Sequence, residues 1–388
     1  MVYELYPSAH GAILRGELEQ TYASGPTVSA ADTLRCPLDA TFDAHKRSWI
    51  DRSTQAAFVT GVRSSPGQAV GEYSIEVVLD HATIPAAPDT TTEGAMTGVP
   101  SADIFFRAGG WQVASSASAD YAGLKPDNVT LLGNNNDRIL TYTYKPRSTG
   151  ANFTSGRFQY TEISESGEGY LHDLTGARHG WTLRMNGADH WILACDGNSL
   201  ATKPSKVSPT ITSAFADNDA VVGVGGNYSV CKMVATADTF GKASETADAS
   251  TLTAFVYNME LASNLEIQPI VAPNGSLGVA QCRYVAGRPS LSLTMDQVTW
   301  SDDWDLYTFA DEGRAIRITN AIPQPGTAPT SFVVFQGVFQ ITDISRGSEN
   351  GYKNVSLTLD YLYPDSSGDG GGLAPDAGIT FKYVTIMA

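Results

Sequence analysis

Apolar and polar residues alternate along much of this chain, as they do in half-buried β-strands. In 181–195, Trp181, Leu183 and Met185 are separated by polar residues, and Asn186-Gly187 supplies a tight turn. A period of two on either side of Asn-Gly is typical of a β-hairpin. The segment therefore predicts a hairpin with one face in a hydrophobic core.

The second half of the chain has the same character. Residues 265–284 predict a hairpin with Asn274-Gly275 at its tip, and residues 354–363 predict a strand. Three apolar residues of that strand share one face because side chains alternate across a sheet. They are Val355, Leu357 and Leu359.

Two short helices are expected, one in each half. In 100–110, Ser101 would be the N-cap and Gly109-Gly110 the stop; in 301–313, Ser301 would be the N-cap and Gly313 the stop. We expect the apolar side of each helix to face the core. The inward residues would be Ile104, Phe105, Ala108, Trp304, Tyr307 and Phe309 or Ala310.

One sequence element occurs twice. The stretch GRFQYTEISESGEGY (156–170) and its copy GVFQITDISRGSENGY (337–352) are identical at nine of fifteen aligned positions. Such self-similarity predicts a duplicated domain. We therefore expect the strands of the two copies to lie at equivalent positions in two similar domains.

The duplication suggests where the domains begin and end. We predict a first domain at 1–200, with an N-terminal arm over about 1–45, and a second domain at 213–388. Residues 201–212 contain two prolines among Ser, Thr and Lys, as linkers often do. Each half is long enough to bury a core of its own.

Composition supports an all-β chain and argues against nucleic-acid binding. Only 17% of the 388 residues are charged, and the net charge is −16. A tight grip on phosphates needs clustered Lys and Arg, which this acidic chain lacks. The start has no signal-peptide pattern, and no apolar run reaches the length of about 18 residues that a membrane span needs.

The cysteines and the polar clusters suggest structural roles. Four scattered cysteines without a C-x-x-C pattern predict buried free thiols: Cys36, Cys195, Cys231 and Cys282. Asp302, Asp303 and Asp305 beside Trp304 are candidates for hydrolysis, but acids also complement the first turn of a helix. A second group invites a metal or an acid–base pair but has no ligand spacing: His172, His179 and His190 with Asp173 and Asp189. We predict no enzyme, metal or cofactor.

A family resemblance adds to these observations. The segment GYLHDLTGARHGWTLRMNGADHWILACDG (169–197) resembles a part of bacteriophage tail tube (major tail) proteins in which a strand ends in L-T-G-A-R-G and a hairpin follows. Arg288-Pro289 and the stretch 337–359 look like later elements of that family, and the resemblance extends from about residue 70 to the end. His179 departs from the pattern, which usually has Gly or Asp there.

The resemblance implies an all-β fold of two tandem β-sandwich domains, each with a short flanking helix. Three copies would form a ring with pseudo-sixfold symmetry, whose sheets join into an inner β-barrel, and stacked rings would form the tube of a long flexible tail. Expected partners are further copies of the chain, a tape-measure protein and tail-end proteins. DNA would pass through without specific binding, and assembly would take place in the host bacterial cytoplasm.

The repeated element also suggests assembly contacts, and two other functions stay open. Polar segments at the ends of the two copies would reach a neighbouring subunit: Glu165, Ser166, Gly167 and Glu168 in the first, and Arg346, Gly347, Ser348, Glu349 and Asn350 in the second. One alternative is a ring-forming distal tail or tube-end protein. The other is a carbohydrate-binding β-sandwich that uses Trp111, Trp181 and Trp191 as sugar platforms, although core packing suits these residues better.

Overall fold

The chain is described here from a computed structural model, and the statements below concern the residues that it describes. These are 12–29, 32–34, 40–50, 65–79, 100, 102–118, 138–147, 153–163, 168–186, 190–208, 230–235, 251–253, 256–296, 305–311, 313, 315–323, 331–349, 351–361 and 379–387.

Strands make up most of the described chain, and the all-β expectation is confirmed. The first strands are β1 Ala12–Glu19, β2 Thr41–Ile50, β3 Ser65–Val78, β4 Trp111–Ser118, β5 Arg138–Pro146, β6 Ser155–Ile163, β7 Gly169–Asn186, β8 Ile192–Leu200 and β9 Ser205–Val207. The later strands are β10 Val230–Ala235, β11 Thr251–Thr253, β12 Val256–Ala262, β13 Glu266–Ser276, β14 Val279–Ala286, β15 Ser290–Asp296, β16 Ala315–Pro323, β17 Ser331–Glu349, β18 Tyr352–Tyr361 and β19 Thr380–Met387. Two short helices, α1 Asp103–Ala108 and α2 Leu306–Asp311, complete the described elements.

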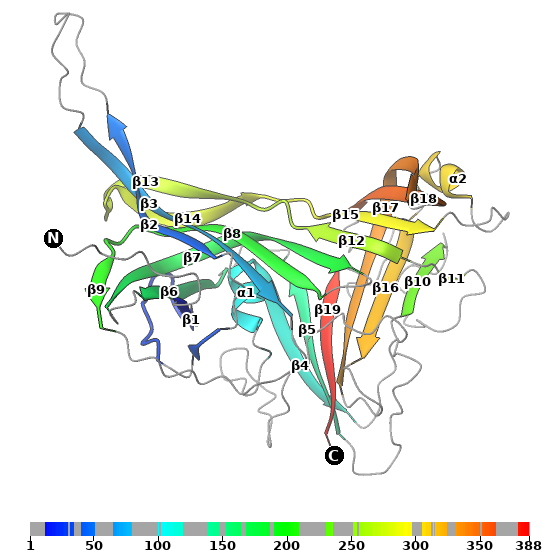
Figure 1. Cartoon of the computed structure of the whole chain (residues 1–388), viewed down its shortest axis with the longest axis horizontal. Helices are drawn as coiled ribbons and strands as arrows, with labels where there is room; N and C mark the ends of the chain where they lie inside the picture. The colour runs from blue at the N-terminus through cyan, green and yellow to red at the C-terminus, as the bar shows by residue number, and fades with distance from the viewer. Residues whose placement is uncertain are drawn as a thin grey trace, which may run out of the picture.

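Eight antiparallel strands form one long sheet, in the order β2-β3-β8-β7-β12-β15-β18-β17. In Figure 1 part of this sheet, with β12, β15 and β18, lies along the top of the molecule. The strands alternate cleanly: Val355, Leu357 and Leu359 of β18 are buried, as predicted. This alternation gives the long sheet one face in the core and one polar face.

Two further groups of strands pack beneath the long sheet. One has the order β1-β6-β7-β9, and the other has the order β10-β16-β17-β19, extended by β5 and β4 next to β19. Strands β7 and β17 therefore each begin in a lower group and end in the long sheet. Figure 1 shows β4, β5 and β19 running down to the end of the molecule that holds the C-terminus.

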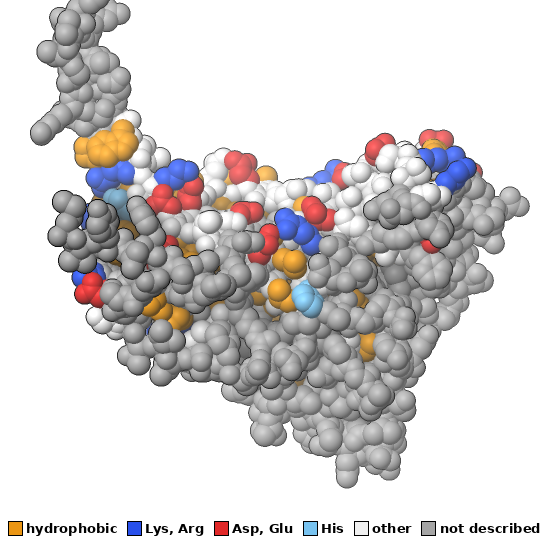
Figure 2. All heavy atoms as spheres, in the orientation of Figure 1, with side chains coloured by type: hydrophobic (Ala, Val, Ile, Leu, Met, Phe, Trp, Pro, Cys, Tyr) orange, Lys and Arg blue, Asp and Glu red, His pale blue; other side chains and the backbone are white. Residues whose placement is uncertain are grey.

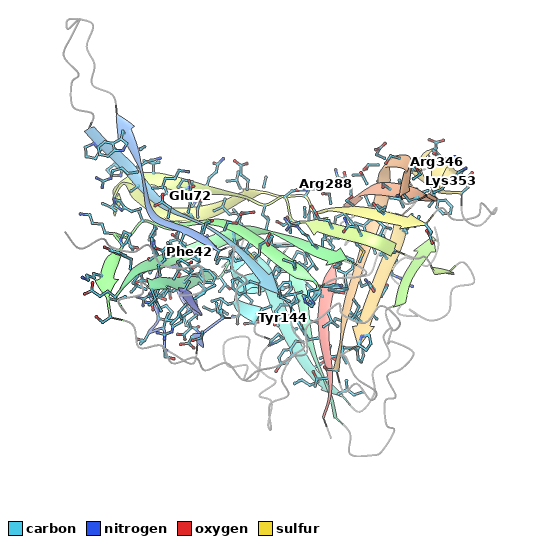
Figure 3. The ribbon with its side chains drawn as sticks, in the orientation of Figure 1. Phe42, Glu72, Tyr144, Arg288, Arg346 and Lys353 are labelled. Carbon is cyan, nitrogen blue, oxygen red and sulfur yellow. The ribbon has the colours of Figure 1, made fainter. Side chains whose placement is uncertain are left out.

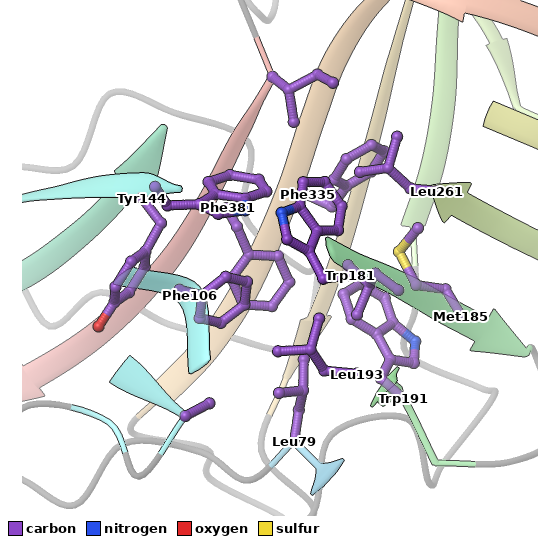
Figure 4. Close-up of a cluster of buried hydrophobic side chains, with 14 of the residues drawn as sticks. Leu79, Phe106, Tyr144, Trp181, Met185, Trp191, Leu193, Leu261, Phe335 and Phe381 are labelled. Carbon is purple, nitrogen blue, oxygen red and sulfur yellow. The ribbon is translucent and has the colours of Figure 1, made fainter. Parts of the chain in front are cut away.

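One hydrophobic cluster fills the space between these layers and draws side chains from both halves of the chain. Tyr144, Trp181, Leu261, Phe335 and Phe381 all belong to it, and Figure 4 shows how their side chains lie together. Large aromatic side chains contribute much of the buried apolar area in such a core. Trp181, Leu183 and Met185 all face it, as the sequence predicts.

The hairpins form where the sequence predicts them, but one turn is displaced. β7 and β8 pair with Leu183 opposite Leu193. In the β13–β14 hairpin, the turn is at Leu277-Gly278, where both φ angles are positive, and not at Asn274-Gly275. Leucine rarely adopts that conformation. Here the Leu277 carbonyl accepts a hydrogen bond from the Ala69 amide, so packing on β3 accompanies the shifted turn.

Both helices exist, and both begin later than predicted. The N-cap of α1 is Ala102 rather than Ser101, and Asp103 is buried, where it accepts a hydrogen bond from the Tyr144 hydroxyl at 2.9 Å. α2 follows Asp305, whose carboxylate accepts bonds from the Thr308 side chain and amide; these bonds hold the pKa of Asp305 below its usual value. Tyr307 is exposed, not inward. Residues 301–304 lie outside the described part.

The two halves of the chain are joined by β-ladders. β7 pairs with β12, and β5 pairs with β19, so hydrogen-bonded strands cross the predicted boundary twice. Part of the predicted linker 201–212 is strand β9, which pairs with β7. The division into domains at 1–200 and 213–388 stays a prediction.

Candidate functional site

The outward face of the long sheet is polar and acidic, and we call it the polar face. Residues with short side chains, which do not project far from the sheet, lie between its carboxylates; examples are Thr182, Ser292, Thr358 and Ser345. Figure 3 shows Glu72 and Arg288 along the polar face, whereas Phe42 and Tyr144 lie beneath it. The eight carboxylates belong to Asp43, Glu72, Glu76, Asp196, Glu260, Asp296, Asp343 and Asp360.

Three basic side chains offset only part of this charge. Arg184 lies 2.9 Å from Glu76 and 3.9 Å from Glu260, so it links β3, β7 and β12 across the junction between the two halves. The other two pairs are Lys46 with Glu72 at 2.6 Å and Arg288 with Asp360 at 3.2 Å. Exposed pairs of this kind contribute little to stability. Among the described side chains, eight acids stand against three bases, so the polar face stays negative. Figure 2 shows acidic and basic side chains, in red and blue, along the upper edge of the molecule.

A groove of about 610 Å³ lies where β2, β3 and β8 meet the start of β13. Asp43, Glu72, Asp196 and Glu266 line it together with aromatic and apolar side chains. Carboxylates at such close quarters repel polyanions. The groove therefore has the same charge as the polar face on which it opens.

The pattern of strand pairing occurs twice along the chain. Six pairs of the first set, β1 to β9, are β2–β3, β3–β8, β8–β7, β1–β6, β6–β7 and β7–β9. Six pairs of the second set, β10 to β19, match them: β12–β15, β15–β18, β18–β17, β10–β16, β16–β17 and β17–β19. Within the described part, the pairs β4–β5, β10–β11 and β13–β14 have no separate counterpart in the other set. Each set therefore contributes four strands, in the same order, to the long sheet.

The long sheet has two open edges at opposite ends. Where the sets meet, β7 of the first pairs antiparallel with β12 of the second, with Leu183 opposite Leu261. Among the described residues, β2 pairs only with β3, and β17 beyond Ile341 pairs only with β18. By position, β2 corresponds to β12 and β17 to β7. The open edges are thus the counterparts of the two strands that pair inside the chain.

The repeated sequence does not mark equivalent positions, contrary to our expectation. Residues 156–163 form β6, which lies between β1 and β7, whereas 337–345 belong to β17, which passes from β16 to β18. By pairing pattern, the counterpart of β6 is β16. A strand's place depends on its partners, and an alternating segment such as this one suits either place.

The predicted contact residues lie in different surroundings. Residues 346–349 continue β17 as a strand rather than a loop, and Arg346, Gly347 and Ser348 are exposed there. Glu168 is exposed and forms an ion pair with Lys206 at 2.5 Å. Residues 165–167 and 350 lie outside the described part. The contact role of both groups stays a prediction.

The β13–β14 hairpin, which we call the second arm, crosses the first set of strands. The Asn198 side chain donates to the Ile267 carbonyl at 3.1 Å, and the Ala69 amide donates to the Leu277 carbonyl at 3.1 Å. At Gly180, a Cβ would lie 2.8 Å from the Leu265 carbonyl oxygen. Only glycine permits this close approach.

Arg178 anchors the second arm. The sequence did not predict this role, because Arg178 was noted only as part of the stretch L-T-G-A-R that carries the resemblance. Its guanidinium donates to the Cys282 carbonyl at 2.8 Å and to the Phe153 carbonyl at 2.7 Å. The same group lies over the rings of Tyr22 and Tyr284, 4.7 Å and 5.5 Å from their centroids. A planar cation between two aromatic faces suits Arg rather than Lys. A lone Arg in sequence gives no sign of such a position.

The cysteines are buried thiols where the structure describes their side chains. Cys195 and Cys282 are free and buried, as predicted. Burial raises the pKa of the Cys282 thiol to about 11, so it stays protonated and unreactive at neutral pH. Cys36 and the side chain of Cys231 lie outside the described part.

The three candidate histidines do not form one site. Within the described residues, no cluster of three or more His, Cys, Asp or Glu side chains has the geometry to hold a metal. His179 is fully buried: its Nε2 donates to the Phe105 carbonyl at 2.7 Å, and its Nδ1 accepts from the Tyr73 hydroxyl at 2.9 Å. A carbonyl can only accept, so these partners select the neutral tautomer with the proton on Nε2.

Stability should fall in acid because His179 is held neutral. Burial lowers its pKa from 6.5 to about 4, so between these values the unfolded chain binds a proton that the folded chain does not. We expect the free energy of unfolding to drop by about 3 kcal/mol as the pH falls from 6.5 to 4. The contribution of His179 is measured by urea unfolding of the wild type and of His179→Gln, in which the Gln side chain can keep both hydrogen bonds. Equal pH slopes in the two proteins would contradict the assignment.

Neither described helix has the length and apolar character that crossing a bilayer requires. No known protein family model matches the chain, and a search of curated proteins finds no significant match.

Proposed function

We propose that this chain is a structural virion protein, the subunit of a bacteriophage tail tube, built by tandem duplication of a β-sandwich domain. The observation that carries the proposal is the repeat of four strands in the long sheet, with one junction inside the chain and two open edges. Open edges are a hazard for a monomer, and a polymer subunit uses them for pairing.

Repetition of the internal junction closes a ring. The β7–β12 pairing joins one set of four strands to the next, so the same step between chains pairs β17 of one copy with β2 of the next. Three copies of eight strands then form a barrel of 24 strands. The strand spacing of about 4.8 Å, with a tilt between 0 and about 40°, gives a backbone diameter of about 37 to 48 Å. Duplex DNA, about 20 Å across, passes through such a barrel with side chains in place.

The polar face suits the lining of this conduit. Its eight carboxylates and small hydroxyl side chains face away from the core. DNA carries one negative charge for about every 1.7 Å of duplex, so a net negative lining does not hold the passing molecule. The apolar faces stay within the wall, between the long sheet and the lower groups of strands.

Negative-stain electron microscopy of the purified protein, over a range of concentrations, tests the proposal. We expect stacked hollow tubes whose end views have threefold or pseudo-sixfold symmetry. Single closed rings that do not stack would favour the distal tail or tube-end alternative. Dispersed monomers at every concentration would contradict both.

The carbohydrate-binding alternative requires exposed tryptophan rings. Trp111, Trp181 and Trp191 are all buried in the core, where no sugar ring reaches their faces. The tail tube proposal includes a virion location, assembly in the host bacterial cytoplasm, and contacts with tape-measure and tail-end proteins.

A further inference from the structure

The outer part of β2 and β3, residues 47–50 and 65–69, projects beyond the other described strands, and we call it the first arm. Figure 1 shows this hairpin extending from the upper left of the molecule. The Ala69 amide bonds to the Leu277 carbonyl near the base of the arm. Further out, residues 47–50 pair with residues 65–69, and the Trp49 side chain is 66% exposed. A large aromatic side chain so exposed on a projecting hairpin is a mark of a contact surface.

The second arm is the counterpart of the first. In the second set, β12 and β15 are the neighbours that correspond to β2 and β3, and the chain between them continues as the β13–β14 hairpin. That hairpin lies across β7 and β8 of the first set, held by Arg178 and Asn198. Inside the chain, therefore, the arm of one set rests on the set that precedes it in the long sheet.

From this precedent we propose that the first arm of one copy rests on the second set of the neighbouring copy, across its β17–β18 hairpin. The inference depends on the ring proposed above, because pairing of β2 with the neighbour's β17 brings the arm to that surface. It goes beyond the ring by assigning the arm a partner and a contact region. We call residues 343–347 and 354–358, which correspond by pairing to 178–182 and 194–198, the receiving surface.

The receiving surface has the shape that this contact needs. In the internal example, the second arm approaches β7 closely at Gly180. By pairing, the counterpart of Gly180 on β17 is Ser345. Ser345 and Gly347 are exposed and small, and they lie on the same face of the strand, so a crossing hairpin can approach there as well. On the other face of β17, the Arg346 guanidinium lies 5.3 Å from the centre of the Tyr307 ring.

The position of the receiving surface agrees with the expected ring. Figure 3 shows Arg346 and Lys353 together beside α2, at the end of the long sheet opposite the first arm. A projection at one end and its receiving surface at the other make a head-to-tail contact, which closes when the rotation per copy is a whole fraction of a turn. Gly347, one of the predicted contact residues, then acquires a specific partner, the first arm.

Photo-cross-linking tests this assignment. A chain with benzoylphenylalanine in place of Trp49 is mixed with ¹⁵N-labelled wild-type chain, assembled and irradiated, and cross-linked peptides are identified by mass spectrometry. We expect adducts between the unlabelled arm and labelled peptides from 343–358. The isotope separates contacts between copies from contacts within one copy. The same photo-reactive residue at Val271, an exposed position on the second arm, is the control and should not label these peptides.

The possible outcomes distinguish a wrong arm assignment from a wrong tail tube proposal. Tubes in the microscope with adducts only in other regions, such as the first set of a copy in the next ring, would overturn the arm assignment and leave the tail tube proposal intact. Monomers without adducts between copies would overturn the tail tube proposal, and the arm assignment with it.

Discussion

Cysteines placed on the two open edges of the long sheet should trap a covalently closed ring of three chains. Glu349 of β17 and Asp43 of β2 lie at opposite ends of the sheet, at the positions that correspond by pairing to Arg184 and Glu260 of the internal junction. If β17 pairs with β2 of the next copy in the register of that junction, Cys residues at these positions lie about 4 Å apart at Cβ and form a disulfide. After oxidation of the Glu349→Cys, Asp43→Cys protein, a non-reducing gel should show a dominant band at three times the chain mass.

The partner position is scanned because register decides whether the bond forms. Thr41→Cys replaces Asp43→Cys in a second variant, and each single Cys variant is tested alone. The internal junction provides the matched control: Arg184 and Glu260 lie directly opposite each other, so Arg184→Cys with Glu260→Cys should close a bond within one chain. A ladder that continues to four chains and above, or no bond between chains at any scanned position while tubes form, would rule out this ring closure.

Replacing Arg178 by Met should destabilise the chain by about 2 to 5 kcal/mol, because each buried carbonyl left without its donor costs about 1 to 3 kcal/mol. The side chain is 8% exposed and is held by the Cys282 and Phe153 carbonyls. Its removal leaves both carbonyls without their donor and frees the second arm from β7. Urea unfolding measures the loss, and limited proteolysis detects release of the arm.

Two variants make the Arg178 prediction specific. Arg178→Lys keeps the charge but has no planar fork, so we expect it to recover less than half of the lost stability. Arg184→Met removes an arginine from the polar face, whose ion pairs with Glu76 and Glu260 are partly exposed, and should change stability by less than about 1 kcal/mol. If Arg178→Met were as mild as Arg184→Met, Arg178 would not anchor the arm.

Local pattern predicted the elements of this fold better than their ends. The alternation of Trp181, Leu183 and Met185 placed one face of β7 in the core, and Val355 and Leu357 did the same for β18. These predictions hold because burial of one face of a sheet depends on a period of two that any local window contains.

Turns and caps depended on contacts with distant residues. The second arm turns at Leu277-Gly278, beside the amide of Ala69, although Asn274-Gly275 is the stronger local signal. α1 begins after Ala102, and its buried Asp103 receives a hydrogen bond from Tyr144. Local propensities differ by about 1 kcal/mol or less per residue, so a few tertiary contacts override them.

The sequence by itself determined that this chain is β-rich and acidic, that its hairpins alternate between core and solvent, and that one element is repeated. Tertiary structure alone decided the order of strands, and it placed the repeated stretches in β6 and β17, which are not counterparts. Among the described residues, it also gathered eight carboxylates on one face and left one edge of β2, and of β17 beyond Ile341, without a partner strand. The reason is physical: a local pattern specifies which face of a strand is buried, whereas its neighbours depend on pairing between residues far apart in the chain.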